Sequence, residues 1–309
     1  MSDCGPAVRL EGVSKSFGRH TAVSDLDLEI PRGSIYGLLG PNGSGKTTTI
    51  RMIMGILRPD EGSVSLFGSS PEITRRAKVG YLPEERGVYR KMRCIELITF
   101  LAEIRGMGRE AGRRRGGEWL ERMGLAEWAD RKVEDLSKGM QQKIQFIGTV
   151  IHEPELLILD EPFSGLDPIN QDVLEGIVRE LHAGGATVLF STHLMDQAER
   201  LCERVCLISR ARKVLDGELR VLKRAERRGV VLVETDGPAA WIAGPDVDRV
   251  DEVGGAFHIV LAEGADPQAI LRRGVGAGAE IRRFDLPEPR LHEIFVRHAG
   301  AMDETGGAS

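Results

Sequence analysis

One short stretch limits the folds open to this chain more than any other. Residues 40–47 read GPNGSGKT and fit the pattern GxxxxGK[ST] without a departure. The apolar run at residues 34–39 predicts a strand before it, and residues 48–57 carry apolar side chains at helical spacing. A strand, a glycine loop and a helix in this order present backbone N–H groups to phosphate at a helix N-terminus. The stretch therefore predicts an α/β nucleotide-binding fold.

The loop residues have separate expected roles. Lys46 would reach the β- and γ-phosphates, and the hydroxyl of Thr47 would bind Mg²⁺. The expected cofactors are therefore a nucleoside triphosphate and Mg²⁺. The residues expected at the phosphates are Gly40, Pro41, Asn42, Gly43, Ser44, Gly45, Lys46, Thr47 and Thr48.

A second apolar run, at residues 156–159, ends in Asp160 and Glu161. Such a run is typical of a strand that is buried on both faces of a parallel sheet. Side chains alternate along a strand, so the two carboxylates should point in different directions. Asp160 could hold the Mg²⁺ shell, directly or through water, and Glu161 could act as general base on the attacking water.

Three further pieces narrow the class. They are LSKGMQQK at 136–143, SGLD at 164–167 and STH at 191–193, the last of them after a strand-like run at 186–190. In this order the motifs resemble those of the ATP-binding-cassette (ABC) ATPases. The resemblance implies an α/β P-loop NTPase cassette, with a mixed-sheet core and a helical subdomain. It also implies two cassettes that meet head to tail, with ATP between the phosphate loop of one and the LSGGQ motif of the other.

The resemblance assigns further roles residue by residue. Ser137 and Gly139 match the LSGGQ residues whose amides contact the γ-phosphate bound by the opposite subunit, at a helix N-terminus. Lys138 and Met140 depart from that motif, at its first glycine and its glutamine. The geometry of this loop is therefore left open.

Three more positions take roles from the same resemblance. Asp167 matches the aspartate that crosses the dimer interface. His193 matches the histidine that contacts the γ-phosphate, which places it with Glu161 and Lys46 among the catalytic candidates. Phe17, in SKSFG, matches the aromatic residue that stacks on adenine.

One residue replaces a family residue of the site. In GYLPEERGVY at 80–89, Glu84 stands where the family carries a glutamine that connects Mg²⁺ or the attacking water to the transmembrane partner. A carboxylate can also bind Mg²⁺, so Glu84 is a candidate metal ligand. Among ABC ATPases, PEERG-x-Y followed by a C-terminal extension looks like a subgroup of exporter cassettes.

The motifs indicate two domains. The expected cassette spans residues 1–217, with a helical subdomain at about 85–150 that contains helices at 94–105 and 117–123 and with a last hairpin at 211–219. A basic helix-like connector at 219–229 leads into a small accessory α/β domain within 218–309. That domain is expected to hold strands at 230–234, 257–262 and 280–286 and helices at 266–273 and 291–298. Its expected roles are dimer contact, regulation or partner docking.

Composition excludes several classes of protein. The chain has 42 basic and 47 acidic residues and a net charge of −5, which argues against a nucleic-acid binder. No stretch approaches 18 consecutive apolar residues, so a membrane-spanning part would belong to another polypeptide. The runs 113–115, 223–224 and 227–228 are expected to be solvated, or else close to anionic lipid headgroups, with 113–115 between two helices. Unpaired, reduced thiols are expected at Cys4, Cys94, Cys202 and Cys206, with the last two on one helix face.

The sequence therefore predicts the ATP-binding and hydrolysing subunit of an ABC exporter. The predicted assembly is a homodimer, or a pair with a closely related cassette, bound to separate transmembrane permease subunits. The predicted location is cytoplasmic and peripheral, on the inner face of the cell membrane, with no nucleic-acid partner. The alternative is a soluble non-transport ABC ATPase with a regulatory or nucleic-acid role. A switch that binds ATP without hydrolysis is disfavoured by the presence of Glu161 and His193.

Overall fold

The computed structural model describes residues 5–71, 78–85, 87, 89–226 and 229–305, with side chains as far as residue 298. The expectations for Cys4, Arg227 and Arg228, and for positions 86 and 88 of the PEERG-x-Y segment, lie outside the described residues. The chain divides into two compact units, and the boundary along the sequence lies between Leu219 and Arg220.

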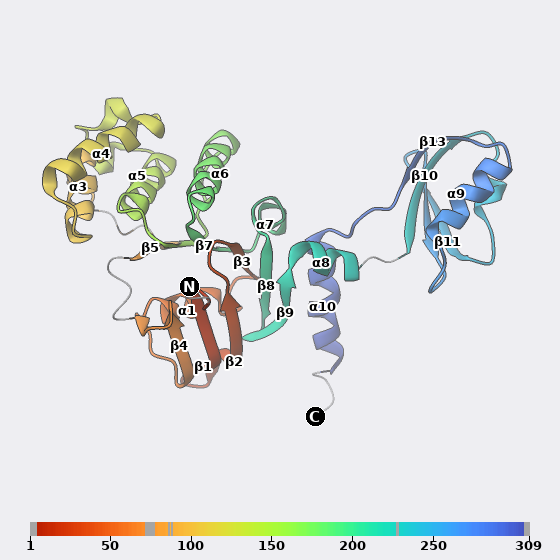
Figure 1. Cartoon of the computed structure of the whole chain (residues 1–309), viewed down its shortest axis with the longest axis horizontal. Helices are drawn as coiled ribbons and strands as arrows, with labels where there is room; N and C mark the ends of the chain where they lie inside the picture. Colours follow the sequence, from red (N-terminus) through yellow and green to blue (C-terminus); the bar gives the residue numbers. More distant parts are fainter. Residues whose placement is uncertain (1–4, 72–77, 86, 88, 227–228, 306–309) are drawn as a thin grey trace. The chain divides into compact units, whose positions relative to one another are not determined.

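The first unit is built on a mixed sheet of six described strands (Figure 1). Five of them are parallel, and β9 pairs antiparallel with β8 in the expected last hairpin. Every residue of β3, β6 and β7 is buried, which explains their continuous apolar runs. In spatial order the strands are β5 Val79–Leu82, β6 Leu156–Asp160, β7 Thr187–Thr192, β3 Ile35–Leu39, β8 Arg204–Ser209 and β9 Arg212–Glu218.

A second, antiparallel sheet in this unit was not predicted. It has the order β2-β1-β4, with β1 Val8–Phe17, β2 His20–Ile30 and β4 Glu61–Leu66. Helix α1, Lys46–Ile53, contacts β2 and β4 of this sheet and β6 of the larger one. Its buried Ile50 joins one core cluster with residues of both sheets. The helix that follows the phosphate loop is thus fixed by apolar packing against both sheets.

Three helices gather beside the larger sheet (Figure 1). They are α3 Cys94–Ile104, α4 Arg109–Arg122 and α5 Lys138–Val150, with short 3-10 turns at Ala126–Trp128 and Val133–Asp135. A Cβ on Gly116 of α4 would lie 2.8 Å from Ile98 of α3, so a glycine lets these helices pack closely.

Two sequence predictions about this unit were wrong. Arg113, Arg114 and Arg115 lie inside α4, because that helix begins eight residues earlier than predicted. Cys202 and Cys206 do not share a helix face, since Cys202 follows α7, Met195–Leu201, and Cys206 lies in β8. Cys94, Cys202 and Cys206 are free, as expected. All three are also buried, and burial raises the pKa of their thiols.

The second unit contains an antiparallel sheet of four described strands with the order β11-β12-β10-β13. Its small apolar core includes Val231, Ile259 and Ile270. The predicted strands and helices are present, but β11 was missed because none of its residues is buried and its sequence, VDRVDEV, shows no clear apolar face. The elements are α8 Leu219–Ala225, β10 Val230–Asp236, β11 Val247–Val253, β12 Ala256–Leu261, α9 Pro267–Gly276, β13 Glu280–Asp285 and α10 Leu291–Thr305.

Among the described residues, no helix has both the length and the apolar character needed to cross a bilayer.

Candidate functional site

The phosphate loop connects β3 to α1 and lies against the backbone of neighbouring segments. Gly40 and Gly45 adopt φ angles of 151° and 112°. A Cβ on Gly40 would lie 2.1 Å from the carbonyl oxygen of Ile208, and one on Gly45 would lie 2.3 Å from that of Ala22. Only glycine fits these two positions, because both the backbone angle and the space exclude a side chain.

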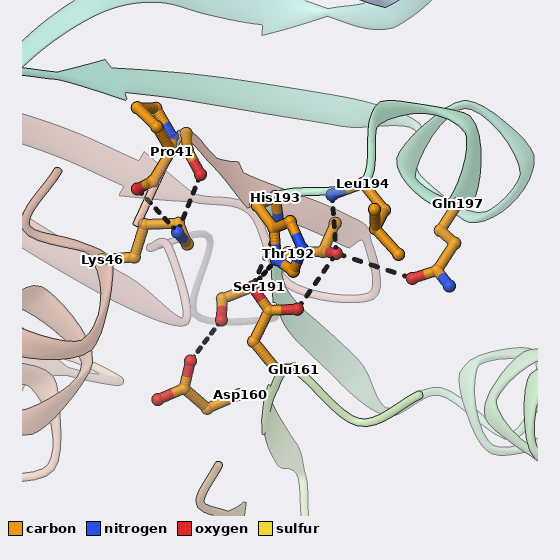
Figure 2. A network of polar contacts seen from close by, with 10 residues as sticks. Pro41, Lys46, Asp160, Glu161, Ser191, Thr192, His193, Leu194 and Gln197 are labelled. Atoms are coloured by element: carbon orange, nitrogen blue, oxygen red, sulfur yellow. Dashed lines mark hydrogen bonds and ion pairs between the residues drawn. The ribbon is translucent and has the colours of Figure 1, made fainter. Parts of the chain in front are cut away.

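The ammonium group of Lys46 lies against its own loop. Its Nζ donates to the carbonyl oxygens of Gly40 at 2.8 Å and Pro41 at 3.1 Å (Figure 2). Burial lowers the pKa of Lys46, and the negative charges of Glu161, Asp160 and Glu84 oppose that shift. The loop thus holds a buried cation beside three carboxylates.

Asp160, at the end of β6, is 1% exposed and has one carboxylate oxygen satisfied. Ser191 Oγ, on the neighbouring strand β7, donates to its Oδ1 (Figure 2). Asp160 Oδ2 is buried and has no hydrogen-bond partner. Burial raises the pKa of this carboxyl group, and the hydroxyls of Ser191 and Thr47 oppose the shift. A buried oxygen without a donor can accept a cation, which would also remove the cost of its burial.

Glu161 follows Asp160 in an unusual backbone conformation, with a φ of 50° and only 8% of its surface exposed. Its Oε1 accepts from the backbone N–H of His193 at 3.0 Å and lies 2.8 Å from His193 Nδ1. Its Oε2 lies 3.3 Å from the hydroxyl of Thr192 (Figure 2). The last residue of β7 and the residue that follows it therefore hold the two oxygens of this carboxylate.

Lys46 and Glu161 meet in a cleft of about 350 Å³, a size typical of small-molecule sites. Phe17, 49% exposed at the end of β1, forms part of the wall. A neighbouring hollow contains Thr47, Glu84 and Asp160 together with Arg51 and Tyr81. The cleft is lined by Phe17, His20, Ala22, Asn42, Gly43, Gly45, Lys46, Thr47, Thr48, Glu84 and Glu161.

Some predicted site residues do not line the cleft itself. Asp160 borders the neighbouring hollow, and His193 contacts Glu161. Ser137, Gly139 and Asp167 line neither the cleft nor that hollow. The phosphate-loop residues outside the cleft lining are Gly40, Pro41 and Ser44. Ser137 is exposed and caps α5, and its Oγ accepts from the backbone N–H of Met140 at 3.3 Å. Asp167 is also exposed and caps α6, Pro168–Ala183, where hydrogen bonds from the backbone and side chain of Asn170 lower its pKa.

The donor set of the site fits Mg²⁺ and a phosphate chain. Thr47 and Asp160 line one hollow, and the unpartnered Asp160 Oδ2 is a hard oxygen ligand of the kind that Mg²⁺ prefers. In the described part of the chain, no group of three or more His, Cys, Asp or Glu side chains is placed to hold a metal ion. The buried Ser44 Oγ, also without a partner, adds a donor at the phosphate loop.

The sequence reasoning missed several residues of this site. It noted STH at 191–193 for the histidine alone, whereas Ser191 contacts Asp160 and Thr192 contacts Glu161. The alternation of side chains along a strand was the available signal, because the two hydroxyls are adjacent on the strand next to the two adjacent carboxylates. His20 and Ala22, which also line the cleft, carry no local signal of their role.

Comparison with known proteins gives consistent matches over both units. The ABC transporter family profile matches residues 23–164, and the profile for the C-terminal domain of DrrA1-3-like ATP-binding proteins matches residues 217–299. The uncharacterized ABC transporter ATP-binding protein YhaQ of Bacillus subtilis is 42% identical, over 96% of this chain and 99% of its own length.

Two further matches extend these findings. Nod factor export ATP-binding protein I of Burkholderia orbicola is 36% identical, over 95% of this chain and 97% of its own. A solved structure described as the ATP binding subunit of an ABC transporter aligns with a TM-score of 0.66 at 31% identity, and the alignment covers 71% of this chain and 92% of that one. Together with the phosphate loop, the acidic strand end and the mixed sheet, these matches show that the chain belongs to the ABC transporter ATP-binding proteins, the ATP-hydrolysing subunits of transporters.

Proposed function

We propose that two copies of this chain enclose two ATP molecules with Mg²⁺ and drive export through separate transmembrane permease subunits. The observation that carries the proposal is the cleft that holds Lys46, Thr47 and Glu161 beside the buried Asp160. The Nod factor export relative and the match to the DrrA1-3-like C-terminal domain support the direction of transport.

Within the cleft, Lys46 and the loop amides bind the phosphates, and Thr47 with Asp160 would hold Mg²⁺. The metal ion, when bound, neutralises charge on the phosphate oxygens. Glu161 takes a proton from the attacking water, whose oxygen bonds to the γ-phosphorus. The bond from that phosphorus to the bridging oxygen breaks, and ADP leaves with the electron pair.

Two other cleft residues complete the nucleotide site. Phe17 offers an exposed ring for stacking on adenine at the cleft wall. Glu84 borders both the cleft and the hollow with Thr47 and Asp160, so its carboxylate is available to the Mg²⁺ shell.

The second copy supplies what the cleft of one chain does not contain. Ser137 and Gly139 are at the start of α5, outside the cleft of their own chain, where amides at a helix N-terminus can bind a γ-phosphate presented by a partner. Lys138 is exposed beside them and adds positive charge. His193 would contact the same phosphate, and Asp167 would cross the interface between the copies.

The proposed domain organisation places the cassette at residues 1–217, with its helical subdomain at about 85–150, and the accessory domain at 218–309. Attachment to permease subunits would place the chain at the inner face of the cell membrane. The net charge of −5 gives no support to the alternative of a nucleic-acid machine.

A mixing experiment with two inactive variants tests the shared site. Lys46→Ala removes a phosphate ligand, and Gly139→Asp places a carboxylate at the start of α5. We expect each variant alone to lose ATP hydrolysis. An equal mixture should recover about a quarter of wild-type activity, because half of the dimers are mixed and each mixed dimer has one intact site of two.

The matched control is the double variant, Lys46→Ala with Gly139→Asp on the same chain, mixed with Lys46→Ala alone. No site in that mixture is intact, so it should stay inactive. Failure of the two single variants to recover activity on mixing, with both shown to be folded and to form mixed dimers, would contradict the head-to-tail arrangement.

A further inference from the structure

Two adjacent hydroxyls face two adjacent carboxylates at the ends of neighbouring strands. Asp160 of β6 pairs in register with Ser191 of β7, and Ser191 donates to it. Because successive side chains point to opposite faces of a strand, Thr192 is turned away from Asp160, and its hydroxyl lies beside Glu161 (Figure 2). Ser191 therefore donates to the carboxylate proposed for metal binding, whereas Thr192 contacts the carboxylate of the proposed base.

The two oxygens of the Glu161 carboxylate differ in their number of contacts. Two groups of His193 contact Oε1, the backbone N–H at 3.0 Å and Nδ1 at 2.8 Å. For Oε2, Thr192 provides the one hydrogen bond among the described residues, at 3.3 Å. The φ of 50° at Glu161 is unfavourable for a residue with a side chain, so the surroundings must hold this conformation.

The hydroxyl of Thr192 has one proton and two acceptors. It accepts from the backbone N–H of Leu194 at 3.0 Å, which directs its proton elsewhere. The acceptors are Glu161 Oε2 at 3.3 Å and Gln197 Oε1 at 3.5 Å. Both distances exceed the usual 2.7–2.8 Å or so of an O–H···O bond, so both hydrogen bonds are long. Catalytic hydrogen bonds are often long without substrate and tighten in the complex.

These three side chains are shielded from water. Thr192 is 0% exposed, Glu161 8% and Gln197 9%. Water therefore competes weakly for the hydroxyl proton, and its direction is decided by the protein. Gln197 belongs to α7, which begins just after His193, so the network joins this helix to the carboxylate of Glu161.

We propose that Thr192 is a positioning residue for ATP hydrolysis. Its hydroxyl donates a hydrogen bond to Glu161 Oε2 and so orients the carboxylate toward the attacking water. Gln197 Oε1 competes for the same proton. The proposal rests on the role of Glu161 as general base.

The test is steady-state ATP hydrolysis by the purified full-length chain, with nucleotide affinity measured separately from the fluorescence of a labelled ATP. Thr192→Val keeps the branched shape and removes the hydroxyl. We expect kcat to fall about 10- to 100-fold, because a misplaced catalytic group loses rate and not substrate binding. KM and the affinity for labelled ATP should stay within about twofold. Thr192→Ser, which restores the hydroxyl, should recover kcat to within about threefold of wild type.

Thr187→Val is the matched control. Thr187 is a buried threonine of the same strand, 1% exposed, and its Oγ1 also accepts a backbone N–H, that of Gly33 at 2.9 Å. None of the hydrogen bonds of Thr187 in the described part of the chain involves Glu161. Loss of its hydroxyl should therefore lower thermal stability and leave kcat nearly unchanged. If Thr192→Val does not fold, Thr192→Ala carries the test, with folding checked by thermal melting and labelled-ATP binding.

Several outcomes would overturn the proposal. They are a kcat of Thr192→Val close to wild type, a loss confined to KM, or a serine variant as impaired as the valine variant. Glu161→Gln, assayed alongside, separates this proposal from the function on which it rests. An inactive Glu161→Gln with a fully active Thr192→Val rejects only the positioning role, whereas an active Glu161→Gln rejects the base itself.

Discussion

The two units use charge in opposite ways. At the candidate site of the first unit, Lys46, Asp160 and Glu161 are at most 8% exposed and lie close together. In the sheet of the second unit, ion pairs such as Arg282 with Asp236, at 2.5 Å, are formed by side chains that are 67% and 45% exposed. These three groups of the first unit are removed from water, whereas the Arg282–Asp236 pair of the second unit stays solvated.

The difference lies in what water does to each charge. A buried carboxylate must find donors within the protein, which fixes its direction and makes every partner important. An exposed pair is already solvated, so its two members gain little from each other. The following predictions test this contrast in order of expected effect.

The largest effect should come from Glu161→Gln. The substitution keeps the size of the side chain and the hydrogen bond from the backbone N–H of His193, but it removes the proton acceptor. We expect kcat for ATP hydrolysis to fall by about 100-fold or more, with ATP binding retained. Stopped-flow or steady-state phosphate release, together with labelled-ATP binding, measures both quantities. Turnover near the wild-type rate would show that another group takes the proton.

An intermediate effect on stability should come from lowering the pH, through His152, a partly buried residue near the end of α5. Burial, aided by the positive charges of Arg105 and Arg115, lowers the pKa of this imidazole to about 4. A hydrogen bond with the backbone of Val79 opposes this shift. As pH falls from the ordinary value of 6.5 toward 4, the unfolded chain takes up a proton that the folded chain does not, so stability is lost over this range.

Thermal melting between pH 7.5 and 5 measures this loss. The melting temperature should fall further for the wild type than for His152→Asn as the pH is lowered. Above pH 7, the melting temperatures of the two proteins should depend on pH in nearly the same way. Equal acid sensitivity of the two proteins would assign the loss to other groups.

The smallest effect should come from Arg282→Ala in the second unit. Its partner Asp236 stays solvated when the arginine is removed, so the free energy of unfolding should change by less than about 1 kcal/mol. Urea denaturation of the full chain, followed by a probe of the second unit, measures the change. A loss of several kcal/mol would mean that this exposed pair behaves like the buried charges of the cleft.

The sequence predicted best those parts of the fold that depend on patterns of neighbouring residues along the chain. The phosphate loop, the apolar strands β3, β6 and β7 and most elements of the second unit follow from local patterns. The sheet β2-β1-β4 was not predicted, since no motif marks its strands apart from the aromatic residue Phe17. Strand β11 was missed because an exposed edge strand need not show an apolar face.

The sequence alone indicated the family and the two-part organisation and predicted the chemistry of the site, because a phosphate loop and an acidic strand end require particular residues at fixed spacing. The tertiary structure decided which groups surround each of those residues. It placed Ser191 against Asp160 and Thr192 against Glu161, across thirty-one positions of sequence. Such contacts arise from the alternation of side chains along each strand and from the pairing of β6 with β7. The pairing is not recorded in the order of residues along the chain.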